Sequence, residues 1–240
     1  MFWRLCRLQY GKSVTYRKRS DPLSLWAAAP LRACESRLLS TNVSSMFRIS
    51  PDNPAYYLTS VARDRLPVFR TDRIKTIACN AIDEARRSGC FLVLASVIMP
   101  DHMHLVTSSA LGVSETLRYI NGIAGHRIIS HLKEAGHESS LRKLLREGDA
   151  WGHKYSLWDH HPNARQLTNE ASLMQRVNYT HLNPVRLGLV ERPEDYRWSS
   201  ARQWRGCPVE DEPLSPRLTA SRAAEPLGEE RGERSALRGR

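Results

Sequence analysis

Two histidines that alternate with hydrophobic residues are the first group in this sequence that could carry out chemistry. His102 and His104 follow the corner Pro100-Asp101 and are separated by Met103. Residues two apart on a β-strand point to the same side, so a strand here would hold both imidazoles on one face. Two adjacent imidazoles make half of a metal site. Taken alone, however, the pair is better explained as two ordinary histidines at the start of a strand.

A tyrosine and an asparagine four residues apart form a second group of this kind. A helix is predicted to begin near Thr168, and on it Tyr179 and Asn183 would lie one turn apart on the same face. Pro184 disfavours helical backbone at the residue before it, which places Asn183 near the helix end. Two imidazoles and an amide oxygen would suit Mg²⁺ or Mn²⁺, and such an ion would help Tyr179 attack a phosphodiester. Alone, Tyr179 fits a core tyrosine better.

The segments around these residues predict the elements that position them. Residues 55–61 are rich in β-prone types, and residues 90–99 are almost continuously apolar, so both predict strands. The second of these would form a hairpin with a strand over residues 102–108. Apolar residues at helical spacing predict helices over residues 72–88 and 114–133.

Residues that cap helices and two further strands complete this prediction. Thr71 and Ser114 are placed as helix N-caps, and Gly89 as the residue that ends the first helix. Short strands are predicted over 154–158 and 164–167. The order strand, helix, strand, strand, helix, strand predicts an α+β, ferredoxin-like split βαβ fold. We expect an antiparallel sheet with helices on one face, followed by a C-terminal helix that carries the tyrosine.

Charge varies along the 240 residues. The net charge is +11, and residues 1–49 hold 9 Lys or Arg against 2 Asp or Glu. We expect a disordered basic extension over 1–49, one catalytic domain over 50–205 and a disordered tail over 206–240. The positive charge favours nucleic acid as a partner. An organellar transit segment, a DNA-binding arm and a translation start at Met46 all remain open explanations of the extension.

The cysteine pattern and the hydropathy restrict the cellular compartment that we expect for the protein. The five cysteines are scattered and form no C-x-x-C pair, which argues against a disulfide scaffold or a thiolate zinc site and fits a reducing compartment. No apolar stretch approaches the ~20 residues of a membrane span. We therefore expect a cytoplasmic protein with no membrane partner.

Four blocks of sequence, in order, resemble the REP-associated tyrosine transposases. This family belongs to the HUH (His-hydrophobic-His) single-tyrosine transposase superfamily. The resemblance covers about residues 51–205, and its blocks are Leu66–Phe69, Val97–Leu105, Tyr179–Val190 and Glu194–Ala201. Because the four occur together and in order, the resemblance is far more specific than any one block.

The resemblance implies a metal-dependent enzyme that cleaves and rejoins single-stranded or hairpin DNA. It also implies a 5′-phosphotyrosine intermediate and a free 3′-hydroxyl. By this resemblance His102 and His104 match the two metal-binding histidines and Tyr179 matches the nucleophile. Asn183 matches the third ligand, where related transposases have Gln. Mg²⁺ or Mn²⁺ is the implied cofactor, and repetitive extragenic palindromes are candidate DNA partners.

The sequence restricts the DNA contacts, the oligomeric state and the alternative functions less closely. Arg118 and Arg186 are the predicted contacts to the DNA backbone, and a homodimer is left open. Two other functions also remain open: a catalytically silent, domesticated protein that grips DNA hairpins, and a metal-dependent hydrolase that uses water as its nucleophile. The presence of all four site residues argues against the first. A covalent protein–DNA adduct would separate the transposase from both.

Overall fold

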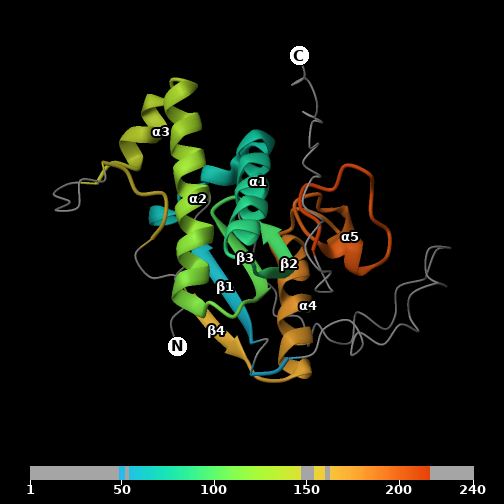
Figure 1. Cartoon of the computed structure of the whole chain (residues 1–240). Helices are drawn as coiled ribbons and strands as arrows, with labels where there is room; N and C mark the ends of the chain where they lie inside the picture. Colours follow the sequence, from blue (N-terminus) through green and yellow to red (C-terminus); the bar gives the residue numbers. More distant parts are fainter. Residues whose placement is uncertain (1–48, 52–53, 147–153, 160–162, 217–240) are drawn as a thin grey trace, which may run out of the picture. The chain divides into compact units, whose positions relative to one another are not determined.

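The computed structural model describes residues 49–51, 54–146, 154–159 and 163–216 of the chain. Within these ranges no helix is long and apolar enough to cross a membrane. The basic extension predicted for 1–49 lies outside the described residues, except for Ile49. The strands and helices, shown in Figure 1, are β1 (Ala55–Val61), α1 (Asp72–Ser88), β2 (Leu92–Ile98), β3 (His102–Ser108), α2 (Val113–Glu134), α3 (Glu138–Lys143), β4 (Asn163–Leu167), α4 (Glu170–Arg186) and α5 (Ala201–Trp204).

The four strands form one sheet in the order β2-β3-β1-β4. All three neighbouring pairs are antiparallel, and β1 lies between β3 and β4. In the β1–β3 ladder Thr59 is opposite His104 and Val61 is opposite His102. The element order and the antiparallel pairing confirm the predicted α+β fold, and they place the two histidines on an interior strand.

Helices cover both faces of this sheet. Alternate residues of each strand point to opposite sides, and the apolar side chains on both sides are buried. On one face Leu58 and Leu105 pack with Ile82 of α1 and Ile120 of α2. These two helices lie side by side in Figure 1. On the other face Tyr57, together with neighbouring apolar side chains of β2 and β3, packs against α4. The two helices on one face and the added C-terminal helix therefore agree with the prediction, and α4 supplies the second layer.

The first helix has the predicted bounds, but the residue with left-handed backbone after it is not Gly89. Thr71 is its N-cap, and its hydroxyl accepts a hydrogen bond from the backbone N–H of Ile74 at 3.4 Å. Gly89 follows the helix with a φ of −94°, and the residue with left-handed backbone is Cys90, whose φ is 49°. Gly89 is required for space instead: a Cβ there would lie 2.9 Å from the Cδ1 of Phe91.

Two local predictions are wrong. Ser114 lies inside α2 and does not cap it, because the chain turns at Gly112, whose φ is 78°. Residues 154–158 form no strand, and their ladder contacts are two isolated bridges at Tyr155 and Trp158. Instead, the indole N–H of Trp158 donates to the carbonyl of Asn121 at 2.8 Å, which ties this segment to α2.

The predicted domain boundary at residue 205 is also wrong, because residues 206–216 pack onto the domain. Leu214 is only 7% exposed and belongs to the main core. The guanidinium of Arg202 forms an ion pair with Glu212 at 2.8 Å, and the Glu212 side chain is only 4% exposed. The polar composition of this segment suggested disorder, although it contains a buried leucine and a buried ion pair. Residues 217–240 lie outside the described residues.

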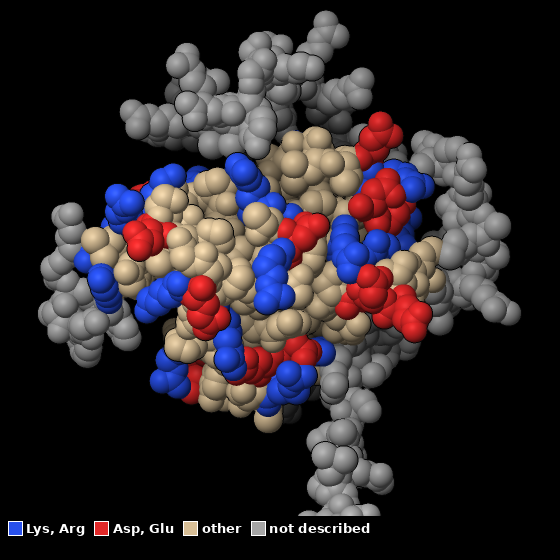
Figure 2. Space-filling view, turned by 90° about the horizontal axis from the view of Figure 1, so that it is seen from above, with Lys and Arg blue, Asp and Glu red and all other residues tan. Residues whose placement is uncertain are grey.

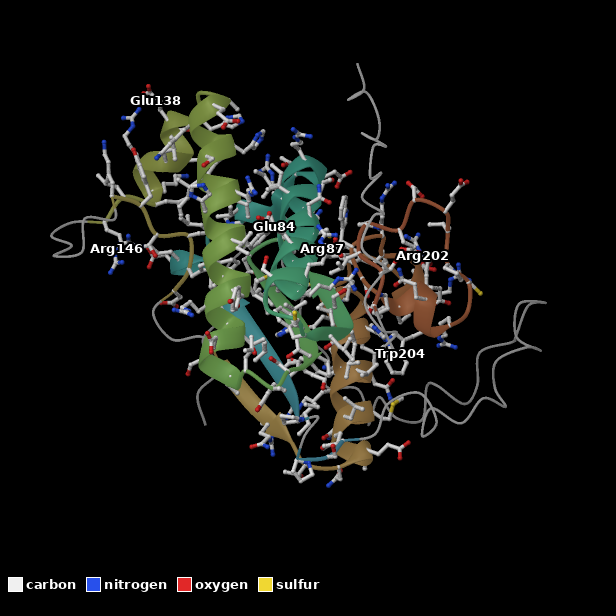
Figure 3. All side chains as sticks on the ribbon, viewed as in Figure 1. Glu84, Arg87, Glu138, Arg146, Arg202 and Trp204 are labelled. Carbon is white, nitrogen blue, oxygen red and sulfur yellow. The ribbon has the colours of Figure 1, made fainter. Side chains whose placement is uncertain are left out.

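The block after α4 covers the outer edge of β2. The N–H of Ile98 donates to the carbonyl of Trp198, and the N–H of Ser200 donates to the carbonyl of Ser96. Trp204 of α5, labelled in Figure 3, donates its indole N–H to the carbonyl of Leu94 at 2.8 Å. These bonds satisfy backbone groups that an edge strand would otherwise expose.

Candidate catalytic site

The two histidines project together from the face of the sheet that α4 covers. His102 and His104 are 9% and 6% exposed, and their ring centroids lie 4.7 Å apart at an interplanar angle of 71°. Met103 and Leu105 point to the opposite face and join the core beneath α1 and α2. The alternation predicted from the sequence is therefore present, with both imidazoles on one side.

Each ring is held through its Nδ1 atom. Nδ1 of His102 lies 2.6 Å from Oδ1 of Asp101. An ionised carboxylate only accepts hydrogen bonds, so this nitrogen donates and the Nε2 of His102 keeps its lone pair. Nδ1 of His104 lies 2.7 Å from the hydroxyl of Tyr57 and 2.9 Å from the hydroxyl of Thr59. In both rings the orienting bonds use Nδ1, so a metal would have to bind through Nε2.

The electrostatic surroundings act on His104 directly and on His102 through Asp101. Burial and the neighbouring His102 lower the pKa of His104 to about 3, so the ring of His104 is neutral at physiological pH. Burial raises the pKa of Asp101, but hydrogen bonds and charges from His102 and Arg65 outweigh it, and the net effect lowers the pKa. Arg65 donates to Asp101 at 2.9 Å. Asp101 is therefore a charged acceptor that fixes the His102 ring.

Helix α4 brings the second group to the histidines. The ring centroid of Tyr179 lies 5.6 Å from that of His104 and 6.0 Å from that of Tyr57. Asn183 is 7% exposed and lies one turn further along the helix. Its side-chain amide donates to the carbonyl of Tyr179 at 2.8 Å, which leaves the amide oxygen as the group that can bind a ligand. The structure therefore brings Tyr179 and His104 together.

The start of α4 is fixed by its own sequence. Asn169 is the N-cap, and its side chain accepts from the N–H of Ser172 at 2.8 Å, as one half of a capping box. Pro184 lies inside the helix, which continues to Arg186 before Gly188 turns the chain with a φ of 66°. Asn183 accordingly lies in the last turn, as predicted.

Arginines of the same helix flank the tyrosine. The guanidinium of Arg186 lies 4.7 Å from the centre of the Tyr179 ring, and that of Arg176 lies 5.9 Å from it. Arg118, the other predicted DNA contact, lies on α2 across the sheet and pairs with Glu115 at 2.8 Å. The structure thus brings Arg186 to the site and does not bring Arg118.

The third histidine near the tyrosine points elsewhere. Nε2 of His181 lies 2.8 Å from the hydroxyl oxygen of Ser200, and its ring lies against Trp204 with the centroids 6.0 Å apart. Burial, assisted by the charge of Arg205, lowers the pKa of His181 to about 3. His181 therefore packs between α4 and α5, and it is not part of the site.

Comparison with known proteins shows which family this chain resembles. Residues 52–168 match the family model of the IS200-like transposases. This part of the chain is therefore similar to the IS200-like transposases. A curated Haemophilus influenzae protein assigned as a REP-associated tyrosine transposase is 26% identical over 149 residues, which cover 60% of this chain and 78% of that protein.

Two solved structures also resemble the chain. One is a REP-associated tyrosine transposase bound to a REP hairpin, with 19% identity, a TM-score of 0.48, and coverage of 75% of this chain and 96% of that chain. The other is a transposase of Deinococcus radiodurans, with 17% identity, a TM-score of 0.39, and coverage of 55% and 92%.

The donor atoms of the candidate site fit a divalent metal ion. Two imidazole nitrogens and one amide oxygen make a mixed set of the kind that Mg²⁺ or Mn²⁺ can accept when substrate oxygens complete the shell. The described residues contain no cluster of three His, Cys, Asp or Glu that could bind a metal. A metal at His102 and His104 would therefore need the oxygen of Asn183, or of the substrate, as its next ligand.

Several residues of the candidate site were missed by the sequence interpretation. It treats Asp101 only as part of a corner, although a carboxylate directly before a histidine is a candidate partner for that ring. Tyr57 and Thr59 have the spacing of one strand face, but their place beside His104 depends on strand register. Arg176 lies three residues before Tyr179, so helical spacing alone could have indicated it.

Proposed function

We propose that this domain cleaves and rejoins single-stranded or hairpin DNA, with Tyr179 as the nucleophile. The observation that carries the proposal is the contact between Tyr179 and His104, whose ring centroids lie 5.6 Å apart. A core tyrosine would not need an imidazole and two arginines against its ring. The family match and the relative assigned as REP-associated support DNA, including repetitive palindromes, as the substrate.

The reaction transfers the DNA backbone to the tyrosine. The phenol oxygen of Tyr179 bonds to phosphorus, and the bond between that phosphorus and the 3′ oxygen breaks. The products are a 5′-phosphotyrosine link and a 3′-hydroxyl, on which the phenol proton ends. Attack by a 3′-hydroxyl on the phosphotyrosine reverses the step and joins DNA. The same chemistry serves cutting and rejoining, so no external energy source is needed.

The surrounding residues hold the reacting groups in place. His102, His104 and Asn183 would bind a divalent ion, which would polarise the phosphodiester. Asp101 and the hydroxyls of Tyr57 and Thr59 orient the two rings through Nδ1. The charge of Arg186 beside the Tyr179 ring would stabilise the negative charge that gathers near the phenol oxygen.

The test is whether the protein becomes covalently linked to DNA through Tyr179. The full chain is incubated with 5′- or 3′-labelled single-stranded and hairpin oligonucleotides plus Mg²⁺ or Mn²⁺ and resolved on denaturing gels. We expect a protein–DNA adduct in the wild type and none in Tyr179→Phe, which loses only a hydroxyl. Tyr119→Phe, a matched change on α2 across the sheet, should form the adduct normally.

The remaining outcomes decide between the alternatives. Cleavage by the wild type without any adduct would overturn the proposal in favour of a hydrolase that uses water. Hairpin binding with neither cleavage nor adduct would favour the silent binding protein. The metal part is tested separately with His102→Ala, which should lose both Mn²⁺ binding and cleavage while its circular dichroism spectrum remains that of a folded protein.

A further inference from the structure

The two faces of the sheet differ in charge. Strands β1, β3 and β4 and helix α4 carry three arginines, Arg165, Arg176 and Arg186, and one acidic residue, Glu170 at the start of α4. By contrast, helix α1 across the sheet carries acidic and basic residues together. Figure 2, seen from above the view of Figure 1, likewise shows Lys and Arg interspersed with Asp and Glu. A surface with one sign of charge attracts a polyanion more strongly than a mixed surface does.

Arg176 is the central member of this group. It is half-buried, and its guanidinium lies 5.0 Å from the centre of the Tyr57 ring and 5.9 Å from that of Tyr179. Stacking against rings uses the flat face of a guanidinium and leaves its N–H groups, which lie in the plane, to donate elsewhere. Among the described residues no salt bridge joins Arg176 to a carboxylate. Its guanidinium therefore lies against the two rings, and no carboxylate of the described residues occupies its donors.

Arg165 lies opposite Tyr57 on the neighbouring strand. The two residues are paired directly in the β1–β4 ladder, so both side chains lie on the face that α4 covers. The Cβ atoms of directly opposite residues are about 4.5–5.5 Å apart. Arg165 is exposed on an edge strand. Tyr57 thus has Arg176 of α4 against its ring and Arg165 of β4 opposite it in the ladder.

We propose that Arg165 and Arg176 form a phosphate-binding site beside Tyr57. The site holds a backbone phosphate of the DNA strand close to the phosphate that Tyr179 attacks. It rests on the proposed function, since it positions the substrate of that reaction. Two guanidiniums suit this ligand because each can donate a pair of parallel hydrogen bonds to phosphate oxygens. Arg165 and Arg176 are positioning residues, and Arg186 remains next to the phosphate under attack.

The salt dependence of DNA binding tests this site without requiring cleavage. Fluorescence anisotropy with a labelled single-stranded oligonucleotide is measured in EDTA at a series of salt concentrations. Each phosphate contact on a single strand contributes about 0.7 to the slope of log K against log salt. We expect Arg165→Gln and Arg176→Gln each to reduce the slope by about 0.7, and Arg176→Lys to restore it because the charge returns. A thermal melt verifies that each variant is folded.

Arg73→Gln is the matched control, because Arg73 is an exposed arginine on α1 across the sheet. Its slope should equal that of the wild type. Wild-type slopes in both Arg165→Gln and Arg176→Gln would overturn the proposal, and so would an equal reduction in Arg73→Gln, which would indicate a diffuse charge effect.

The two proposals fail in different ways. If Tyr179→Phe loses the adduct as expected while the slopes of the arginine variants are unchanged, the phosphate site fails and the reaction stands. If the slopes fall as expected but the wild type never forms an adduct, the phosphate site stands and the assignment of the reaction fails.

Discussion

The hydroxyl of Tyr57 lies 2.7 Å from Nδ1 of His104 and joins two neighbouring strands through their side chains. Thr59, two residues on, reaches the same nitrogen at 2.9 Å. His104 therefore has two orienting partners, whereas His102 has Asp101 alone. The two rings of the proposed metal site should differ in how much they depend on any single partner.

Removal of the Tyr57 hydroxyl should weaken metal binding only in part. In Tyr57→Phe the Thr59 hydroxyl still holds Nδ1 of His104, so we expect Mn²⁺ affinity to fall less than tenfold. Loss of an outer partner commonly lowers metal affinity about 10- to 100-fold, and the double variant Tyr57→Phe/Thr59→Val should show a loss of that size. Isothermal titration calorimetry with Mn²⁺ measures the affinity of each variant. Equal affinities in the single and double variants would show that these hydroxyls do not orient the ring.

Loss of the Asp101 charge should have a larger effect. Asp101→Asn removes the carboxylate that fixes Nδ1 of His102, and no second partner replaces it, so we expect about a 10- to 100-fold loss of Mn²⁺ affinity. Arg65→Gln is the control, because it removes the other partner of Asp101 and leaves the contact to His102. If both variants lost Mn²⁺ affinity to the same extent, the loss would come from a general disturbance of the Pro100-Asp101 turn and not from the contact to His102.

Acid should destabilise the fold through His181. Its pKa is about 3 in the folded protein, while an unfolded histidine titrates near ~6.5. Below ~6.5 the unfolded chain binds a proton that the folded protein does not, so the free energy of unfolding falls by up to about 1.4 kcal/mol per pH unit. Urea melts of the wild type and His181→Gln between pH 6.5 and 5 measure this. The variant should have the shallower dependence, and identical slopes would contradict the prediction.

The segment after residue 205 should contribute to stability. Leu214→Ala removes a side chain that is 7% exposed within the core, and we expect a loss of about 2 kcal/mol, at the lower end for such changes because the site lies near the surface. Val209→Ala, at a position 43% exposed, is the control and should change stability by less than about 0.5 kcal/mol. Urea melts give both values. A neutral Leu214→Ala would mean that this segment does not support the domain.

Local patterns in the sequence were sufficient to predict most of the fold. Helix α1 has the predicted bounds because its apolar spacing and its Thr71 cap are both local signals. The alternation around His102 and His104 likewise predicts which side chains share a face. The left-handed residue after α1 was predicted wrongly, because Cys90, rather than Gly89, takes that backbone, and no composition rule indicates a cysteine there.

Contacts between distant segments were the part that the sequence could not give. The register of β1 against β3 places Tyr57 and Thr59 beside His104, and a shift of one residue would have moved both to the other face. The packing of Leu214 depends on contacts with a core assembled from many segments, so a polar stretch was interpreted as disordered. The predicted roles of Tyr179, Asn183 and the arginines remain predictions, which the experiments above test.

The cover over β2 restricts how this sheet could grow. The carbonyl of Trp198 and the N–H of Ser200 already use hydrogen-bonding groups on the outer side of β2. Within the described residues, no strand pairs with the outer side of β4. A further strand, from a second copy or from a peptide, could therefore add only at β4. That strand has five residues and carries Arg165, and a short, charged edge is a poor template for aggregation.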